Sequence, residues 1–354
     1  MDPRRWIAHL ERLERLCREH PLRYLFLEVT RRCNLRCAYC GSSCTAQESR
    51  AELDGATWIS IIDQVADDFD AKGIMIAVTG GEPLVRGDIF EIFEALRRRG
   101  FRFGMVSNGT HIDGETARRL VASGIGSISL SLDGPPAIND ALRGAGSAAA
   151  IEGAVRALRG AGYEGILEII STITKPVLPA LDELRKIVSR LRVPRWRVAP
   201  VMPIGRAAGR PELLLDGADV RALFDFVLSA RRDALLPAPE MSEEGYLGDA
   251  YEGAVRPYLC RCGAGVTVGG VLHDGHIGAC PELPRAFNQG HVARDRFKDV
   301  WERGYGVFRD RSWAVRRAPC ATCDALDRCR GGAMHLYASP TSEPLRCFYR
   351  MLGG

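Results

Sequence analysis

The sequence lacks the features of an exported, membrane-spanning or nucleic-acid-binding protein. It contains no apolar run of the ~18 residues that a membrane span needs. Its first 20 residues are charged, so no signal peptide is predicted. The net charge is only +4, because 44 acidic residues offset 48 basic ones, and this gives no indication of a nucleic-acid or membrane-surface partner. We therefore expect a cytoplasmic protein.

Cysteine is absent from residues 45–259, although the chain holds 12 of them. Four lie between Cys33 and Cys44, seven lie between Cys260 and Cys347, and Cys17 stands alone. Stable disulfides are rare in a reducing compartment, so this clustering indicates metal or redox chemistry. The 7 histidines form no HExxH array, which gives no support for a zinc hydrolase.

Apolar runs alternate with helical spacing in the first half of the chain, which predicts an α/β fold with parallel strands. Six strands are too few for a closed eight-stranded barrel and suit a partial (β/α)6, TIM-like barrel. The predicted strands are residues 24–30, 73–79, 102–107, 127–132, 165–172 and 195–201.

The pattern of the whole chain divides it into four parts. We expect an N-terminal helix at 1–21, the partial barrel at 22–204, a connector at 205–257 and a small cysteine-rich domain at 258–354. The connector is rich in Gly and Pro and contains a predicted helix at 220–232. The last part contains seven cysteines and only short segments, so we expect bound metal to stabilise it.

The first cysteine cluster follows the first predicted strand. Cys33, Cys37 and Cys40 are separated by three and two residues, and three thiolates on one loop can hold three corners of a cubane iron–sulfur cluster. Cys44 follows after three more residues, so a zinc site of four thiolates is the alternative. Beyond the next predicted strand lies Gly80-Gly81-Glu82, in which glycines allow close backbone approach and the carboxylate can bind an ammonium group.

This combination of CxxxCxxC and GGE resembles the radical S-adenosylmethionine (radical SAM) enzymes. The resemblance implies that Cys33, Cys37 and Cys40 hold a [4Fe-4S] cluster with one open iron. It also implies that S-adenosylmethionine (SAM) binds this iron and is reductively cleaved to a 5'-deoxyadenosyl radical, which abstracts hydrogen from a substrate. The cofactor carries this chemistry, and the protein supplies orientation and excludes water. An electron donor such as ferredoxin or flavodoxin is implied as a partner.

The same resemblance implies a set of SAM-binding residues. Tyr39 is expected near the adenine, and Gly80, Gly81 and Glu82 at the amino group. Ser107 and Asn108 are expected at the ribose, and Ser131 with Arg143 at the carboxylate, which a guanidinium suits. A structural role for the serines and the arginine is the alternative, and Asp133 is expected only to form a turn.

The C-terminal cysteines resemble the SPASM extension of radical SAM enzymes, which carries two auxiliary [4Fe-4S] clusters. Cys262 is followed after twelve residues by Gly275 and after four more by Cys280. The resemblance implies one cluster at Cys320, Cys323, Cys329 and Cys347, and a second at Cys260, Cys262 and Cys280. A structural zinc module is the alternative.

Ala333 stands where the SPASM pattern has a cysteine, so the second auxiliary site lacks one thiolate. Three outcomes are open: an exposed iron that binds substrate, a non-cysteine ligand such as His273, Asp274 or His276, or a cluster that is smaller or absent. We favour three cysteines and an open position.

The resemblance implies an oxidoreductase that modifies a substrate by radical chemistry. We expect a ribosomally made peptide that undergoes oxidation, cross-linking or epimerisation. The stretch Pro203-Ile204-Gly205-Arg206-Ala207 is similar to one in peptide-modifying and cofactor-forming relatives. Only 23 residues precede the first strand, so a separate peptide carrier protein is expected. Pro281 argues against sulfatase maturation. The alternatives are a small metabolite such as an aminocyclitol or tetrapyrrole, and a non-enzymatic iron–sulfur or zinc scaffold.

Two cysteines belong to none of these clusters. A thiol can donate a hydrogen atom to a carbon radical, which makes Cys44 a candidate catalytic hydrogen donor for epimerisation. The alternative is that Cys44 is a small buried core residue. Cys17 has no assigned role.

Overall fold

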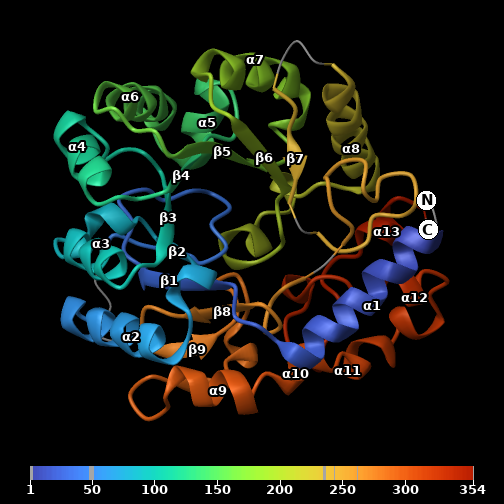
Figure 1. Ribbon diagram of the computed structural model, residues 1–354. Helices are drawn as coiled ribbons and strands as arrows, with labels where there is room; N and C mark the ends of the chain where they lie inside the picture. The colour runs from blue at the N-terminus through green and yellow to red at the C-terminus, as the bar shows by residue number, and fades with distance from the viewer. Residues whose placement is uncertain (1–2, 48–51, 234–236, 243, 261, 354) are drawn as a thin grey trace.

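The computed structural model describes residues 3–47, 52–233, 237–242, 244–260 and 262–353. The described residues form a mixed α/β structure around one sheet of ten strands (Figure 1). Helix α1 (Pro3–Glu19) lies beside the C-terminal helices, where Arg330 forms an ion pair with Glu14 at 3.2 Å. Segments from the two ends of the chain therefore lie together.

All six predicted strands are present, and they lie side by side in parallel and in chain order. The sheet has an edge strand at each end, so the barrel is partial, as expected. Alternate side chains of the first strand, such as Leu25, Leu27 and Val29, are fully buried. The strands are β1 (Tyr24–Thr30), β2 (Met75–Gly80), β3 (Arg102–Ser107), β4 (Ser127–Ser131), β5 (Ile166–Ile173) and β6 (Arg195–Pro200).

Helices follow these strands and cover the outer face of the sheet (Figure 1). Helix α2 (Gly55–Asp68) shows why: Asp54 caps its first turn by accepting a hydrogen bond from the Thr57 amide, and Trp58, Ile61 and Val65 face the core. The other helices that follow barrel strands are α3 (Ile89–Arg98), α4 (Gly114–Ala122), α5 (Pro136–Arg143), α6 (Ser147–Gly160), α7 (Leu181–Leu191) and α8 (Gly217–Arg232). The C-terminal part contains α9 (Phe297–Arg303), α10 (Gly306–Arg309), α11 (Ser312–Val315), α12 (Leu326–Cys329) and α13 (Phe348–Met351).

Four short strands that the sequence did not predict extend this sheet. They are β7 (Glu240–Met241), β8 (Val268–Val271), β9 (His276–Gly278) and β10 (Gly290–His291). Strand β8 pairs in parallel with β1, so the sheet runs on from the barrel into the cysteine-rich part. Its sequence, Val-Gly-Gly-Val, has low strand propensity, which explains why it was missed. The expected domain limits stay predictions.

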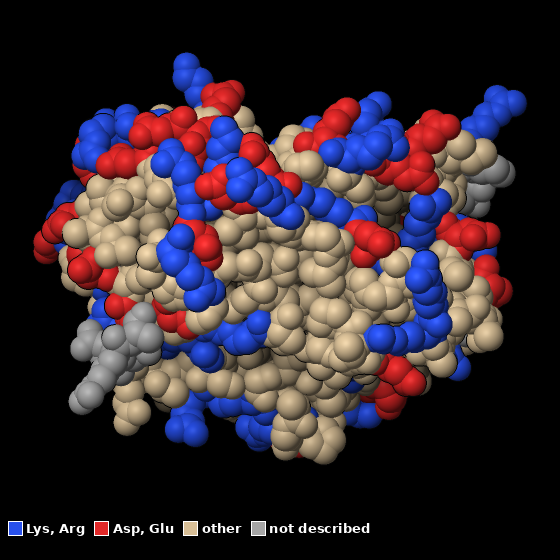
Figure 2. All heavy atoms as spheres, turned by 90° about the horizontal axis from the view of Figure 1, so that it is seen from below, with Lys and Arg blue, Asp and Glu red and all other residues tan. Residues whose placement is uncertain are grey.

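Basic and acidic side chains are interspersed around a broad area of other residues on the face shown in Figure 2. This arrangement is what a net charge of +4 with many charges of both signs leads us to expect. None of the helices in the described ranges is both long enough and apolar enough to cross a bilayer.

Candidate active site

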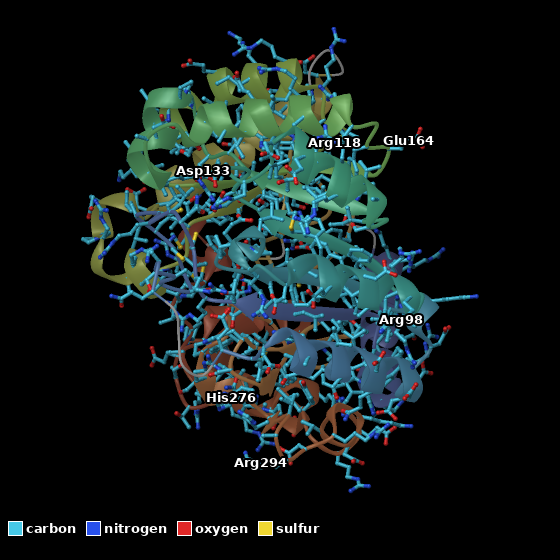
Figure 3. All side chains as sticks on the ribbon, turned by 90° about the vertical axis from the view of Figure 1, so that its left-hand side faces the viewer. Arg98, Arg118, Asp133, Glu164, His276 and Arg294 are labelled. Atoms are coloured by element: carbon cyan, nitrogen blue, oxygen red, sulfur yellow. The ribbon has the colours of Figure 1, made fainter. Side chains whose placement is uncertain are left out.

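A cavity of about 280 Å³ lies at the carboxyl ends of the barrel strands. Asp133, directly beyond β4, lies at this end, beside the loops that follow β1 and β6 (Figure 3). The carboxyl ends of parallel strands are where a barrel gathers its binding groups. Most of the predicted barrel residues line the cavity: Cys33, Cys37, Tyr39, Cys40, Cys44, Gly80, Gly81, Ser107, Asn108, Ser131 and Arg143.

The three thiols of CxxxCxxC face this cavity from one loop. The loop closes on itself, because the Cys33 amide donates to the Thr45 carbonyl at 2.8 Å. A hydrogen bond from the Cys44 thiol lowers the pKa of Cys40 to about 5, and the same pairing with burial raises the pKa of Cys44. No three His, Cys, Asp or Glu side chains of the described residues converge on a point where one metal ion fits. A cubane cluster needs no such convergence, because each thiolate binds a different iron, so the cluster at these three cysteines stays a prediction.

The segment after β6 holds the cysteine loop from the other side. Arg206 Nε donates to the Cys37 carbonyl at 2.7 Å, and its Nη1 donates to the Cys44 carbonyl at 2.8 Å. Gly205 has a φ of +55°, and a Cβ atom there would lie 2.2 Å from the Gly41 carbonyl oxygen. Only glycine fits at this contact, so the Gly205-Arg206 pair has a physical role in shaping the loop.

The end of β2 packs against the start of the same loop. A Cβ atom on Gly81 would lie 2.1 Å from the Arg32 carbonyl oxygen, so the backbone approach requires glycine. Glu82 is fully buried and does not line the cavity; its carboxylate accepts hydrogen bonds from Ser107 Oγ at 3.0 Å and the Asn108 amide at 2.7 Å. It organises the two residues expected at the ribose. Its expected contact with the SAM amino group stays a prediction.

Tyr39, Asp133 and Arg143 form a buried polar network. Asp133 accepts hydrogen bonds from the Tyr39 hydroxyl, from Arg143 Nη1 at 2.9 Å and from the Thr172 amide at 2.8 Å. Asp133 therefore does more than form a turn, as it fixes two residues of the cavity wall. Burial raises the pKa of Tyr39 well above its usual range. Arg143 Nε is buried and has no hydrogen-bond partner in the described structure, so a donor remains for a ligand carboxylate.

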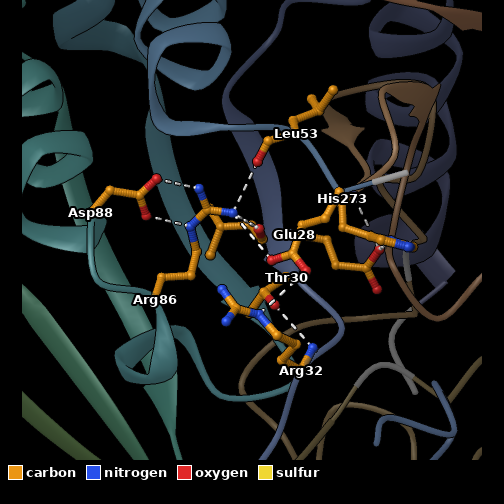
Figure 4. Close-up of polar contacts among 9 residues, drawn as sticks. Glu28, Thr30, Arg32, Leu53, Arg86, Asp88 and His273 are labelled. Carbon is orange, nitrogen blue, oxygen red and sulfur yellow. Dashed lines mark hydrogen bonds and ion pairs between the residues drawn. The ribbon is translucent and has the colours of Figure 1, made fainter. Parts of the chain in front are cut away.

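A second polar network fixes the end of β1, where the cysteine loop begins (Figure 4). Arg86 Nη1 donates to the carbonyls of Val29 at 2.8 Å and Leu53 at 3.0 Å, and its guanidinium binds both oxygens of Asp88. This buried arginine satisfies backbone groups that the strand leaves unpaired. On the other side of β1, buried Glu28 is 2.9 Å from His273 Nδ1, which links the barrel to the C-terminal part.

Four C-terminal cysteines act as one group. Cys320, Cys323, Cys329 and Cys347 lie close enough for the charge of one to raise the pKa of another. Elsewhere, Cys262 similarly affects Cys280, and its Sγ accepts a hydrogen bond from the Met334 amide at 3.4 Å. The division of these cysteines into two cluster sites stays a prediction.

Cys260 packs differently from what the sequence led us to expect. It lies in a small buried cluster with Trp6, Tyr246, Leu259 and Ala325, against which Cys323 and Cys329 also pack. The predicted grouping of Cys260 with Cys262 and Cys280 stays a prediction, and this packing brings Cys260 near Cys323 and Cys329 as well. Spacing in the sequence does not reveal which way a side chain turns.

The candidate non-cysteine ligands are engaged in other contacts. His273 binds Glu28, while Asp274 lies 2.9 Å from Arg285 Nη1 and 3.1 Å from His276 Nδ1. None of the three lines the cavity that the cysteine loop faces.

A pair that the sequence did not single out, Glu244 and His335, lies in the cavity wall with Nε2–Oε2 at 3.2 Å. Burial by itself lowers the pKa of His335, but the hydrogen bond to Glu244 and its charge outweigh this and raise the pKa to about 9. Glu244 lies in the irregular connector, so no pattern marked it. The cavity thus has a charged pair on the side of the cysteine-rich part.

We expect Gly205→Ala to disrupt the cysteine loop, because the new methyl group must displace the backbone at Gly41. Anaerobically reconstituted protein should then bind fewer irons and show less visible cluster absorption. Gly209→Ala is the matched control, since nothing lies within 4 Å of a Cβ atom there. Equal iron content in both variants would contradict the role given to Gly205.

Glu82 should make stability depend on pH, because burial raises its pKa from 4.5 to about 7. Between these values the folded protein keeps a proton that the unfolded chain loses, so the free energy of unfolding falls as pH rises, by up to about 3 kcal/mol. Glu82→Gln should lower stability at every pH but remove this slope. Thermal midpoints of both proteins, measured between pH 4.5 and 7, test this difference in pH dependence. If the midpoints of both proteins changed with pH by the same amount, the prediction would be refuted.

Sequence comparison identifies relatives along most of the chain. Residues 27–189 match the family model described as the Radical SAM superfamily. The chain is 32% identical over 311 residues to the mycofactocin maturase MftC of Mycobacterium tuberculosis, covering 87% of this chain and 77% of that protein. It is 27% identical over 345 residues to the AdoMet-dependent heme synthase of Nitratidesulfovibrio vulgaris, covering 91% of each.

Solved structures share the fold. The enzyme anSMEcpe with bound AdoMet superposes with a TM-score of 0.73 at 19% identity, covering 93% of this chain and 94% of that one. SuiB of Streptococcus suis bound to S-adenosylmethionine superposes with a TM-score of 0.69 at 21% identity, covering 96% of this chain and 80% of that one. The chain belongs to the radical SAM superfamily, whose cofactors are a [4Fe-4S] cluster and S-adenosylmethionine.

Proposed function

We propose that this enzyme modifies a ribosomally made peptide by oxidation, cross-linking or epimerisation. The observation that carries the proposal is the shape of the site. The cavity, at about 280 Å³, is slightly smaller than the ~300–1,000 Å³ typical of small-molecule sites. A second depression adjoins it, which favours an extended substrate that reaches beyond the cavity.

This depression, a groove of about 370 Å³, is available for the part of the substrate outside the cavity. It shares the lining residues Gly41, Ser42, Ile204 and Glu282 with the cavity, so the two lie side by side. Pro281, Leu283 and the exposed Leu345 give it apolar walls. An extended peptide in this groove can place one residue in the cavity and bury apolar side chains along the walls.

The residues of the cavity bind the cluster and SAM in this proposal. Cys33, Cys37 and Cys40 hold the cluster, and bound cluster and SAM together supply a radical that abstracts hydrogen. Gly80 and Gly81 allow SAM to approach the backbone closely. Glu82 binds the SAM amino group, and Ser107 and Asn108 bind the ribose. Arg143, fixed by Tyr39 and Asp133, and Ser131 bind the carboxylate, while Tyr39 borders the adenine.

The relatives support a peptide substrate. MftC, at 32% identity, is named as a maturase, and a structure of SuiB was solved with its precursor peptide SuiA. A separate peptide carrier protein remains part of the proposal.

The cysteine-rich part holds auxiliary clusters in this proposal. Cys320, Cys323, Cys329 and Cys347 form one complete set of ligands. Cys260, Cys262 and Cys280 form a second site, which lacks a thiolate at Ala333 and has an open or exchangeable position.

A small metabolite is the second candidate substrate. The heme synthase of N. vulgaris matches 91% of this chain and 91% of its own length, and a tetrapyrrole substrate is in keeping with that name. The depression that adjoins the cavity favours an extended peptide over a compact macrocycle.

Formation of 5'-deoxyadenosine from SAM under dithionite distinguishes the candidates. We expect a precursor peptide encoded beside this gene to raise the rate, and iron coproporphyrin III to leave it unchanged. Leu345→Glu should raise the KM for the peptide about fivefold, because about 1 kcal/mol of apolar contact is lost.

Ile166→Glu is the matched control for Leu345→Glu, since both side chains are 40% exposed and Ile166 lies at the start of β5. If iron coproporphyrin III but not the peptide raised the rate of 5'-deoxyadenosine formation, the substrate would be a small metabolite and the peptide proposal would be wrong. Absence of 5'-deoxyadenosine under all conditions would reject radical chemistry altogether.

Cys44 is proposed as a hydrogen donor because it lines the cavity. Cys44→Ser keeps a hydroxyl that can hydrogen-bond to Cys40 but has a much stronger bond to hydrogen, so cluster content should persist while epimerisation stops. Iron analysis and deuterium incorporation from D₂O into the peptide measure the two effects. Unchanged deuterium incorporation in Cys44→Ser would exclude Cys44 as the donor.

A further inference from the structure

Two charged residues of the cavity wall have no part in the proposed binding of the cluster and SAM. Glu244 and His335 both line the cavity, and His335 Nε2 lies 3.2 Å from Glu244 Oε2. Their side chains are largely buried, with exposed fractions of 5% and 14%. Taking two charges out of water can cost more free energy than their attraction returns, so such a pair in a cavity wall indicates a functional role rather than a stabilising one.

The pair is held in place by the two segments on which it lies. Fully buried Arg256 donates a hydrogen bond to the Gly245 carbonyl at 2.7 Å, directly after Glu244. Gly245 has a φ of +82°, and a Cβ atom there would lie 3.3 Å from the Ala333 amide nitrogen. The segment that carries Glu244 therefore packs closely against the segment that leads to His335. These backbone contacts fix the two side chains relative to each other.

The second ring nitrogen of His335 is available for a ligand. Nε2 contacts Glu244, and Nδ1 makes no hydrogen bond or ion pair with any residue of the described ranges. Because an ionised carboxylate only accepts hydrogen bonds, Nε2 carries a proton in this contact. Burial lowers the pKa of His335, but the hydrogen bond to Glu244 and the charges of Glu244 and Glu282 raise it to about 9, so Nδ1 also carries a proton at neutral pH. His335 therefore presents an unused N–H donor in the cavity wall.

The surroundings of His335 favour a neutral acceptor on an extended chain. Glu244 already balances the charge of His335, and the nearby carboxylate of Glu282 repels anionic groups. Glu282 also lines both the cavity and the depression that adjoins it. A backbone carbonyl is a neutral acceptor that every residue of an extended peptide presents. A peptide that enters the cavity from this depression passes Glu282 and can offer such an oxygen to Nδ1 of His335.

We propose that His335 donates a hydrogen bond from Nδ1 to a backbone carbonyl oxygen of the peptide substrate and so positions the residue that reacts. Glu244 is a positioning residue that holds the imidazole ring in this orientation. The inference rests on the proposed peptide substrate and adds the group that fixes it in the cavity. A fixed reacting carbon raises the share of radicals that abstract hydrogen from the peptide. His335 transfers no proton in this role.

Two substitutions at His335 separate the roles of its two ring nitrogens. The amide of His335→Gln reaches the place of Nε2 and keeps a contact with Glu244, whereas the shorter amide of His335→Asn keeps a donor near the place of Nδ1. With a precursor peptide encoded beside this gene, His335→Gln should lower kcat/KM for peptide modification about thirtyfold, the order expected for a lost hydrogen bond from a charged donor. His335→Asn should lower it only about threefold, because a weaker donor remains.

The yield of modified peptide per 5'-deoxyadenosine is the second measurement. It should fall in His335→Gln, and also in Glu244→Gln, in which the imidazole ring loses its charged partner. A loss of stability alone would not change this yield, because unfolded protein forms neither product. His291→Gln is the matched control: this half-buried histidine has Nε2 2.9 Å from the Asp274 carbonyl and lines neither the cavity nor the adjoining depression, so its yield should be unchanged.

The outcomes distinguish this inference from the proposed function. If the unmodified enzyme modifies the peptide and His335→Gln does so with equal kcat/KM and yield, the inference is overturned and the proposed function stands. A larger loss in His335→Asn than in His335→Gln would also overturn it, because the contact with Glu244 would then matter and Nδ1 would not. If the unmodified enzyme forms 5'-deoxyadenosine but modifies no peptide, the proposed function fails and the inference fails with it.

Discussion

The rest of the site depends on the hydrogen bonds and close backbone contacts that hold the cysteine loop in place. Three thiols with three and two residues between them adopt a common orientation only if the loop is held from outside. Arg206 binds two of its carbonyls from the segment after β6, and Gly81 packs against its start from the end of β2. Segments far apart in the sequence thus define one loop.

Held in this way, the cysteine loop presents two sides. Its inner side faces the cavity with Tyr39, whose hydroxyl donates to Asp133, as does Arg143 Nη1. Its outer side lines another depression with Arg36 and Ala38. The depression beside Leu345 adjoins the cavity at Gly41 and Ser42, which belong to the same loop.

The sequence predicted those features that depend on local pattern. Apolar runs gave the six barrel strands because buried parallel strands are apolar along their length, and cysteine spacing located the cluster loop. It did not reveal the continuation of the sheet through β8, whose two glycines have little preference for a strand. Nor did it reveal the buried role of Asp133, the packing of Cys260 or the pair Glu244–His335, because each depends on contacts between distant segments.

The central claim is that Cys33, Cys37 and Cys40 hold the cluster that activates SAM. Cys37→Ala and Cys17→Ala, both half-buried thiols, form a matched pair, since Cys17 lies in α1 away from the cavity. Anaerobic iron analysis combined with 5'-deoxyadenosine formation tests it most directly. We predict that Cys37→Ala loses about four irons per chain and all 5'-deoxyadenosine, while Cys17→Ala loses neither. Persistent 5'-deoxyadenosine formation by Cys37→Ala would contradict the claim.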